Sequence, residues 1–251
     1  MNSPSSVPQP PRLGGSLGSL INVPNTITCL NLISGCIATY WALSGRWELA
    51  LLFIVVGAVF DFFDGMTARL LHVSSPIGKE LDSLADDITF GFAPSAIIFS
   101  FLKNSLSLGE GWGEAFPYIA FIMAAFSALR LAKFNLDERQ AMGFIGLPTP
   151  ANALFWASLI VGQAAFLASP RFNALWLFLF MLMFCFFLVA EVPLFALKFK
   201  TFGWEENRVK YTFMAVAIVI LFLGYHTLGV SVIAAIILWY IIWSLLVWKV
   251  R

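Results

Sequence analysis

The sequence predicts an all-α polytopic membrane protein, a bundle of about eight transmembrane helices with both termini in the cytoplasm. Composition is the first observation behind this prediction. The chain has 251 residues, of which 60% are hydrophobic and 12% charged, and its mean hydropathy is +0.86. An average soluble domain carries about 25% charged residues, and soluble monomers rarely expose large apolar patches. A water-soluble domain is therefore excluded, and the net charge of +1 offers no basic surface for nucleic acid.

The second observation is a series of apolar runs, each close to the ~20 residues that a bilayer crossing needs. The runs lack the polar and apolar alternation of barrel strands, and Gly, Ser and Pro clusters separate them. Residues 1–20 hold four prolines and five serines, which predicts a flexible cytoplasmic tail. We expect helices at residues 25–44, 47–72, 77–103, 114–134, 150–168, 173–197, 209–225 and 228–249.

The third observation is the distribution of basic residues between the two sides of such a bundle. With eight spans, only Arg46, Lys103 and Arg171 of the 15 Lys and Arg residues fall on one side, and the other twelve fall on the opposite side. Loops on the cytoplasmic side carry an excess of Lys and Arg. We therefore place both termini in the cytoplasm.

Six of the 14 acidic residues lie between positions 61 and 87, at the end of the second expected span and the start of the third. Carboxylates in apolar helices are costly and usually mark a functional site. Asp61 and Asp64 share one helix face at a spacing of i and i+3, and Asp82 and Asp86 share another at i and i+4. The short turn between the two spans makes them antiparallel neighbours, so four carboxylates can converge near their cytoplasmic ends.

Four converging negative charges repel one another, so either some are protonated or a cation binds. Oxygen ligands suit Mg²⁺, Mn²⁺ or Ca²⁺. Small residues and one Arg flank the acids, which favours a phosphate-bearing substrate. Ser75 and Pro76 have the pattern of an N-cap and a first helical residue, and the helix N-terminus that follows favours phosphate. The flanking small residues and Arg are Gly65, Ala68, Arg69 and Gly78.

This segment resembles the signature of the CDP-alcohol phosphatidyltransferase family, D-x-x-D-G-x-x-A-R, a spacer of about eight residues, and G-x-x-x-D-x-x-x-D. Residues 61–69 read DFFDGMTAR and residues 78–86 read GKELDSLAD. The resemblance implies that Asp61, Asp64, Asp82 and Asp86 bind two divalent ions, Mg²⁺ or Mn²⁺, and that Asp86 is also the base that deprotonates the acceptor alcohol. It further implies a CDP-diacylglycerol site formed by Asn25, Thr28, Gly65, Ala68, Arg69, Ser75 and Gly78.

Three further segments are similar to one branch of that family, the phosphatidylserine synthases: GKELDSLADDITFGFAP at 78–94, SALRLAKFN at 127–135 and FIGLPTPA at 144–151. The resemblance implies a transferase that makes phosphatidylserine and CMP from CDP-diacylglycerol and L-serine. It also implies a homodimer in a bacterial or archaeal cytoplasmic membrane, with the active site facing the cytoplasm. On this basis residues 21–200 form a catalytic core of six helices, and 201–251 add two further helices.

Several alternatives stay open at the level of the sequence. Arg130 and Lys133 could bind the carboxylate of serine or a phosphate of the nucleotide-lipid, or they could be snorkelling cations. The acceptor could be glycerol phosphate, inositol phosphate or choline. A cation transporter could use the same acids, although such sites usually lie near the bilayer midplane. Glu191 is an unexpected acid inside the sixth expected span, where Lys198 is one possible partner.

Overall fold

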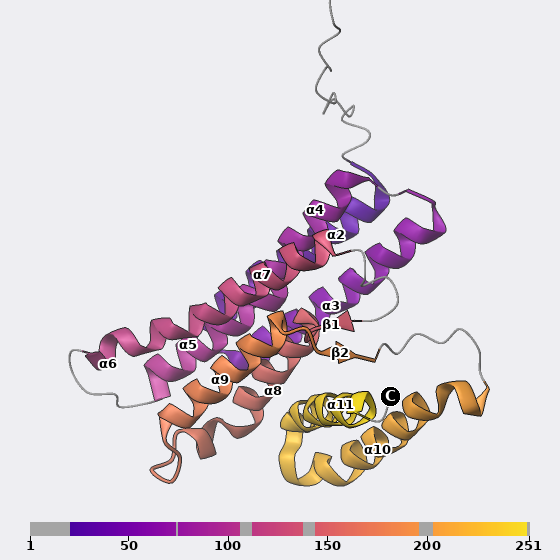
Figure 1. Ribbon diagram of the computed structural model, residues 1–251. Coiled ribbons are helices and arrows are strands. Elements are labelled where there is room, and N and C mark those ends of the chain that lie inside the picture. The colour runs from indigo at the N-terminus through magenta and orange to yellow at the C-terminus, as the bar shows by residue number, and fades with distance from the viewer. Residues whose placement is uncertain (1–20, 74, 106–111, 138–143, 196–202, 250–251) are drawn as a thin grey trace, which may run out of the picture.

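A computed structural model describes residues 21–73, 75–105, 112–137, 144–195 and 203–249 (Figure 1). The predicted flexible tail, residues 1–20, lies outside the described residues. The described part is almost entirely helical, which confirms the all-α membrane bundle. Among the described residues, six helical segments are long and apolar enough to cross a membrane, and a shorter apolar helix accompanies them. The number of spans and the side on which the termini lie remain predictions.

The N-terminal half consists of long helices joined by short turns. α2 (Val23–Leu43) and α3 (Trp47–Leu70) form a tightly packed pair. α4 (Pro76–Asp86), the π-helical segment η1 (Asp87–Phe92) and α5 (Ala93–Ser105) form one continuous helical segment. After residues 106–111 come α6 (Trp112–Ala115), the 3-10 segment η2 (Phe116–Phe121) and α7 (Ile122–Leu136).

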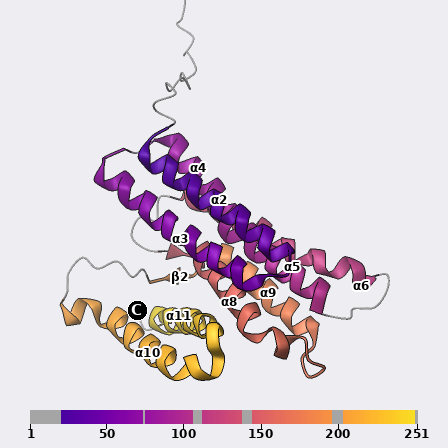
Figure 2. The same cartoon turned by 180° about the vertical axis from the view of Figure 1, so that it is seen from behind.

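The C-terminal half begins with a two-residue strand, β1 (Phe144–Ile145), followed by α8 (Thr149–Leu167) and α9 (Ala174–Val189). The strand β2 (Pro193–Leu194) pairs antiparallel with β1. α10 (Trp204–Leu228), the short turn η4 (Gly229–Ser231) and α11 (Val232–Lys249) form a hairpin. This hairpin lies to one side of the other helices in both views and contacts α8 (Figure 1, Figure 2).

Most expected helix boundaries agree with the structure, and the sixth is wrong. We expected that helix to run to residue 197, but α9 ends at Val189 and β2 follows. Backbone pairing explains the early end, because Gly146 N–H donates to the carbonyl of Val192 at 2.9 Å and the residues beyond Val192 join the β1–β2 pair. Glu191 therefore lies outside the helix, in an exposed connecting segment.

Small residues allow α2, α3 and η1 to approach closely. A Cβ atom on Gly57 would lie 2.5 Å from the Thr89 side chain and 2.9 Å from Asn31 Oδ1, so glycine is needed there for packing. The Thr89 hydroxyl donates to the Asn31 carbonyl at 3.0 Å across the same contact. Close backbone approach at small residues is the usual way in which membrane helices associate.

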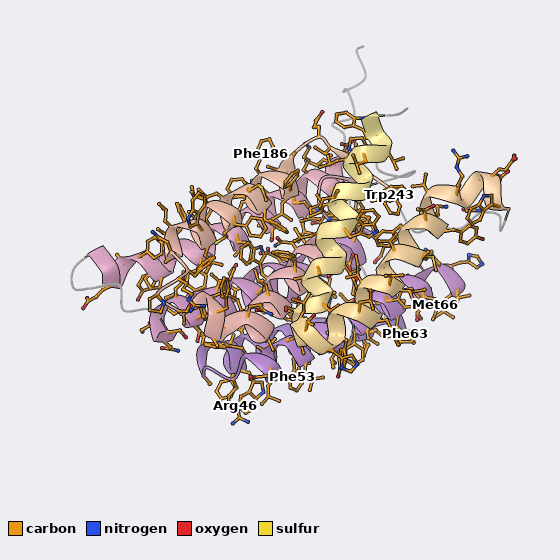
Figure 3. All side chains as sticks on the ribbon, turned by 90° about the horizontal axis from the view of Figure 1, so that it is seen from below. Arg46, Phe53, Phe63, Met66, Phe186 and Trp243 are labelled. Atoms are coloured by element: carbon orange, nitrogen blue, oxygen red, sulfur yellow. The ribbon has the colours of Figure 1, made fainter. Side chains whose placement is uncertain are left out.

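An aromatic layer packs α8 against α9 in the bundle interior. Phe155 and Trp156 of α8 are almost fully buried, and Phe155 stacks on Phe184 of α9 with ring centroids 4.2 Å apart. Other large apolar side chains point outward, among them Phe63 and Phe186 (Figure 3). An apolar exterior around an apolar interior is the arrangement expected of a chain that is embedded in lipid.

The turn between α3 and α4 carries the helix start that the sequence predicts. The Ser75 hydroxyl accepts a hydrogen bond from the Gly78 N–H at 3.0 Å, and Pro76 occupies the first turn. His72 adopts a left-handed conformation, with φ at 52°, where the chain leaves α3. This sharp reversal places the C-terminal end of α3 beside the N-terminal end of α4.

Candidate functional site

Three carboxylates converge where α3 and α4 lie side by side. Asp61 and Asp64 come from the last turns of α3, and Asp82 comes from α4. Each offers one oxygen atom, and these three oxygens all lie within 4.8 Å of one another. Asp64 is buried, while Asp61 and Asp82 are partly buried. The convergence of these three acids across the two helices is as the sequence predicts.

Asp86, the fourth predicted acid, lies beside this group and is held by a different contact. It is 8% exposed, and its Oδ1 accepts a hydrogen bond from Asn31 Nδ2 at 3.1 Å. The charges of Asp61 and Asp82 act on it through space. The π-helical segment η1 begins directly after it, and such segments are frequent at functional sites. Asp86 thus has a fixed orientation next to the three-carboxylate group.

The donor set suits a hard divalent cation. All three converging ligands are carboxylates, which Mg²⁺, Mn²⁺ and Ca²⁺ prefer. Asp64 Oδ2 and Asp82 Oδ1 are buried and have no hydrogen-bond partner among the described residues. Buried oxygens of this kind are rare in folded proteins without a partner. The residues present therefore fit a bound cation.

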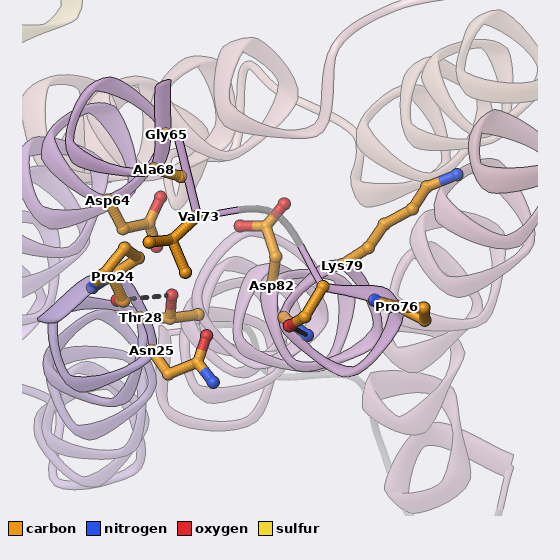
Figure 4. Close-up of a pocket in the computed structure, with 12 residues that line it drawn as sticks. Pro24, Asn25, Thr28, Asp64, Gly65, Ala68, Val73, Pro76, Lys79 and Asp82 are labelled. Carbon is orange, nitrogen blue, oxygen red and sulfur yellow. Dashed lines mark hydrogen bonds between the residues drawn. The ribbon is translucent and has the colours of Figure 1, made fainter. Parts of the chain in front are cut away.

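A cavity of about 500 Å³ opens beside Asp64 and Asp82 (Figure 4). In Figure 4 the two carboxylates face the space between α3 and α4, and Thr28 donates to the Pro24 carbonyl at 3.1 Å. Six of the seven residues expected to bind the nucleotide-lipid line this cavity: Asn25, Thr28, Gly65, Ala68, Ser75 and Gly78. The seventh, Arg69, is not among the lining residues.

Arg69 is exposed and folds back onto its own helix. Its Nε donates to the Gly65 carbonyl at 2.8 Å. A Cβ atom on Gly65 would meet nothing closer than the Arg69 guanidinium at 3.9 Å. Packing within the protein therefore does not require glycine at position 65, and the free space there suits a ligand.

Arg130 and Lys133, for which the sequence allows the same roles, make different contacts in the structure. Arg130 is only 6% exposed, and the charges of Asp86 and Asp61 act on it. Its guanidinium lies 4.9 Å from the centre of the Phe134 ring. Lys133 instead donates to the Val189 carbonyl at 3.2 Å and pairs with Glu191 at 3.4 Å. Glu191 thus pairs with Lys133, while Lys198 lies outside the described residues.

Two residues of the site were not predicted from the sequence. Asn31 donates a hydrogen bond to Asp86. The sequence feature that could have indicated this role is a polar residue three positions after Thr28 within an apolar span. Lys79 lines the cavity, and its side chain extends away from Asp64 and Asp82 in Figure 4. Its amine donates to the Asn135 carbonyl at 2.6 Å, which ties α4 to the end of α7. No sequence pattern indicated that contact.

Comparison with known proteins agrees with the geometry. Residues 21–188 match the pattern of the CDP-alcohol phosphatidyltransferase family. A protein of Bacillus subtilis is 39% identical over 132 residues, which are 51% of this chain and 69% of the relative. One of Helicobacter pylori is 34% identical over 133 residues, 52% and 54% of the two chains. One of Methanocaldococcus jannaschii is 33% identical over 160 residues, 64% and 69%.

All three of these relatives are named CDP-diacylglycerol–serine O-phosphatidyltransferase. The matched segment spans between about half and about two thirds of their length, as the shares of 54% and 69% show.

The carboxylate group yields a direct prediction for cation binding. Asp64→Asn should lower the affinity for Mn²⁺ by about tenfold or more, since even residues that only orient metal ligands cost about 10–100-fold when they are lost. Electron paramagnetic resonance of free Mn²⁺ during a titration measures this affinity. Glu48→Gln is the matched control, because Glu48 is an exposed acid in the first turn of the same helix. Equal affinities in both variants and the unchanged protein would contradict a cation site at Asp64.

Proposed function

The chain belongs to the CDP-alcohol phosphatidyltransferase family, and we propose that it transfers the phosphatidyl group of CDP-diacylglycerol to L-serine, yielding phosphatidylserine and CMP. The observation that carries this proposal is the convergence of Asp61, Asp64 and Asp82 beside a 500 Å³ cavity. The names of the relatives support serine as the acceptor.

The cavity walls suit the nucleotide end of the donor. Small residues of α3 and α4 leave space for phosphates, and the N–H groups at the start of α4 favour negative charge. Asp61, Asp64 and Asp82 would hold a divalent cation, which supplies positive charge to the pyrophosphate when it is bound. Whether two ions bind, as the family resemblance implies, remains a prediction. Arg69 is proposed to reach the phosphates from the rim by leaving the Gly65 carbonyl.

Asp86 is the proposed general base. The hydroxyl group of serine is a poor nucleophile at neutral pH and needs a proton acceptor in the transition state. The serine oxygen would attack the phosphorus of the phosphatidyl group while its proton moves to Asp86. The phosphorus–oxygen bond to CMP then breaks, and CMP leaves with its phosphate. The hydrogen bond from Asn31 would hold the Asp86 carboxylate in one orientation for this step.

Arg130 is the proposed ligand for the carboxylate of serine. It is buried, and it lies within electrostatic reach of Asp86, so a carboxylate bound to it would bring the serine hydroxyl close to the base. A guanidinium group can hold a carboxylate through two parallel hydrogen bonds. Lys133 makes its contacts at the end of α9, so we propose that it acts mainly by holding α7 against α9. Direct binding of serine by Lys133 stays a prediction.

The apolar helices make the protein a multi-pass membrane protein. We propose that it lies in a bacterial or archaeal cytoplasmic membrane, because its relatives come from both groups. The excess of Lys and Arg on one side supports a site that faces the cytoplasm. The acyl chains of the donor would then enter between helices from the bilayer. A homodimer remains a prediction from the family.

An acceptor screen tests the proposed function. Protein in detergent should release CMP from CDP-diacylglycerol when L-serine and Mg²⁺ or Mn²⁺ are added, and phosphatidylserine should form in equal amount. Glycerol phosphate, inositol phosphate and choline serve as competing acceptors. CMP release with one of these and not with serine would keep the phosphatidyl transfer and refute the serine assignment. No CMP release with any alcohol would refute the transferase.

Substitution of the proposed base should separate chemistry from binding. Asp86→Asn should lower kcat by about 10²–10⁴-fold, the usual contribution of a general base, while the affinity for CDP-diacylglycerol stays close to that of the unchanged protein. Radiolabelled donor measures binding, and CMP release measures turnover. Turnover within a few-fold of the unchanged protein would exclude Asp86 as the base.

Substitution of Arg130 should affect the acceptor. Loss of a charge-assisted hydrogen bond costs roughly 1.5–3 kcal/mol, or about tenfold to a hundredfold in affinity. Arg130→Ala should therefore raise KM for serine by that factor and leave KM for CDP-diacylglycerol nearly constant. Lys103→Ala is the control, because Lys103 is an exposed cation at the end of α5. The reverse pattern, weaker donor binding with an unchanged KM for serine, would make Arg130 a phosphate ligand.

A further inference from the structure

Two polar residues in the first turn of α8 are fully buried and have no partner for their side chains. Thr149 and Asn152 are both 0% exposed. The Thr149 hydroxyl and both polar atoms of the Asn152 amide lack a hydrogen-bond partner within the described ranges. Because residues three apart share a helix face, these three atoms lie on one side of α8. Buried polar atoms are nearly always hydrogen-bonded, to protein, water or a ligand.

Hydrogen bonds to the backbone of α9 tie the start of α8 and the part of α7 that follows Arg130 to the same region of the fold. Leu147 N–H, just before α8, donates to the Phe187 carbonyl at 2.8 Å. Lys133, one turn after Arg130 on α7, donates to the Val189 carbonyl at 3.2 Å. The start of α8 and the end of α7 are therefore both fixed to the last turn of α9. Both helices also contact η1, which begins directly after Asp86.

Helix α7 also carries buried polar atoms without partners. On α7, the Ser127 hydroxyl and Arg130 Nε are buried, and neither has a hydrogen-bond partner among the residues described. A Cβ atom on Gly91 of η1 would lie 2.9 Å from the Ser127 Cβ and 2.7 Å from Asp87 Oδ1, so α7 reaches η1 at this point. α7 and α8, which both pack against η1, thus each carry buried polar atoms without partners. The donor cavity is a separate feature, since its lining comes from α2, α3, α4 and the turn between α3 and α4.

We propose that Thr149 and Asn152 form the part of the acceptor pocket that binds the α-ammonium group of the acceptor amino acid, opposite Arg130. An ammonium group donates three hydrogen bonds and needs acceptor oxygens, which the Asn152 carbonyl and the Thr149 hydroxyl provide. The guanidinium on α7 suits the carboxylate of an amino-acid zwitterion, and the neutral oxygens on α8 suit its ammonium group. This assignment rests on the proposed function, and it explains recognition of an amino acid over a plain alcohol.

The test replaces the polar atoms and keeps the shape. Asn152→Leu removes both unpartnered atoms and keeps the number of side-chain heavy atoms, so it should leave the melting temperature equal or higher, because an unpartnered buried polar group is costly. It should raise KM for serine about tenfold or more and leave KM for CDP-diacylglycerol unchanged. 3-Hydroxypropionate, which is serine without its ammonium group, should inhibit the variant and the unchanged protein with the same inhibition constant.

Two further variants keep the test decisive. Thr149→Val makes an isosteric change at the neighbouring position and should show the same pattern if Asn152→Leu does not fold. Ser158→Ala is the control, since Ser158 is buried on the same helix but its hydroxyl donates to the Phe155 carbonyl at 3.2 Å. We expect no change of KM for serine in that control.

The outcomes separate this proposal from the proposed function. An unchanged KM for serine in Asn152→Leu and Thr149→Val, with a lower melting temperature, would mean that the two residues hold buried water or structure, and would overturn the proposal. A parallel rise of the 3-hydroxypropionate inhibition constant would also overturn it, because that compound has no ammonium group. If the unchanged protein does not respond to serine at all, the proposed function fails and this assignment fails with it.

Discussion

Repulsion among carboxylates that lie close together in an apolar bundle is the constraint on which the rest of the site depends. Asp61, Asp64 and Asp82 bring oxygens within 4.8 Å of one another, and Asp86 lies beside them with 8% exposure. Water screens these charges less than it does at an open surface, so a fold that keeps them together needs protonation of some carboxylates or compensating positive charge. Arg130 supplies part of it from α7. A divalent cation and the helix N-terminus at Pro76 are suited to supply the remainder.

Close packing of small residues sets this charge cluster in place. Gly57 allows α3 to approach Thr89 and Asn31, and Asn31 in turn holds Asp86. The same packing that joins α2, α3 and η1 therefore fixes the orientation of the proposed base. On the other side, the end of α9 anchors both α7 and α8.

Periodicity and residue type made the fold class and the three-carboxylate group predictable. Long apolar runs in lipid must be helices, and acids at i and i+3 or i+4 must share a face. The contact between Glu191 and Lys133 could not be predicted in this way. The position of Glu191 depends on the pairing of β1 with β2, and its partner is 58 residues away. Asn31 is 55 residues from Asp86. Contacts at such separations follow from tertiary packing, which local sequence patterns do not encode.

The dependence of thermal stability on cations tests the central role of the carboxylate cluster most directly. The melting temperature of the purified protein in detergent would be measured against Mn²⁺ concentration, for the unchanged chain and for a variant with Asp61, Asp64 and Asp82 all replaced by Asn. A cation that binds only the folded state stabilises it. We expect a rise with Mn²⁺ for the unchanged chain, and for the variant a higher metal-free melting temperature that does not respond to Mn²⁺. A metal-free variant with a lower melting temperature than the unchanged chain would contradict the account. An unchanged chain whose melting temperature does not change with Mn²⁺ would contradict it as well.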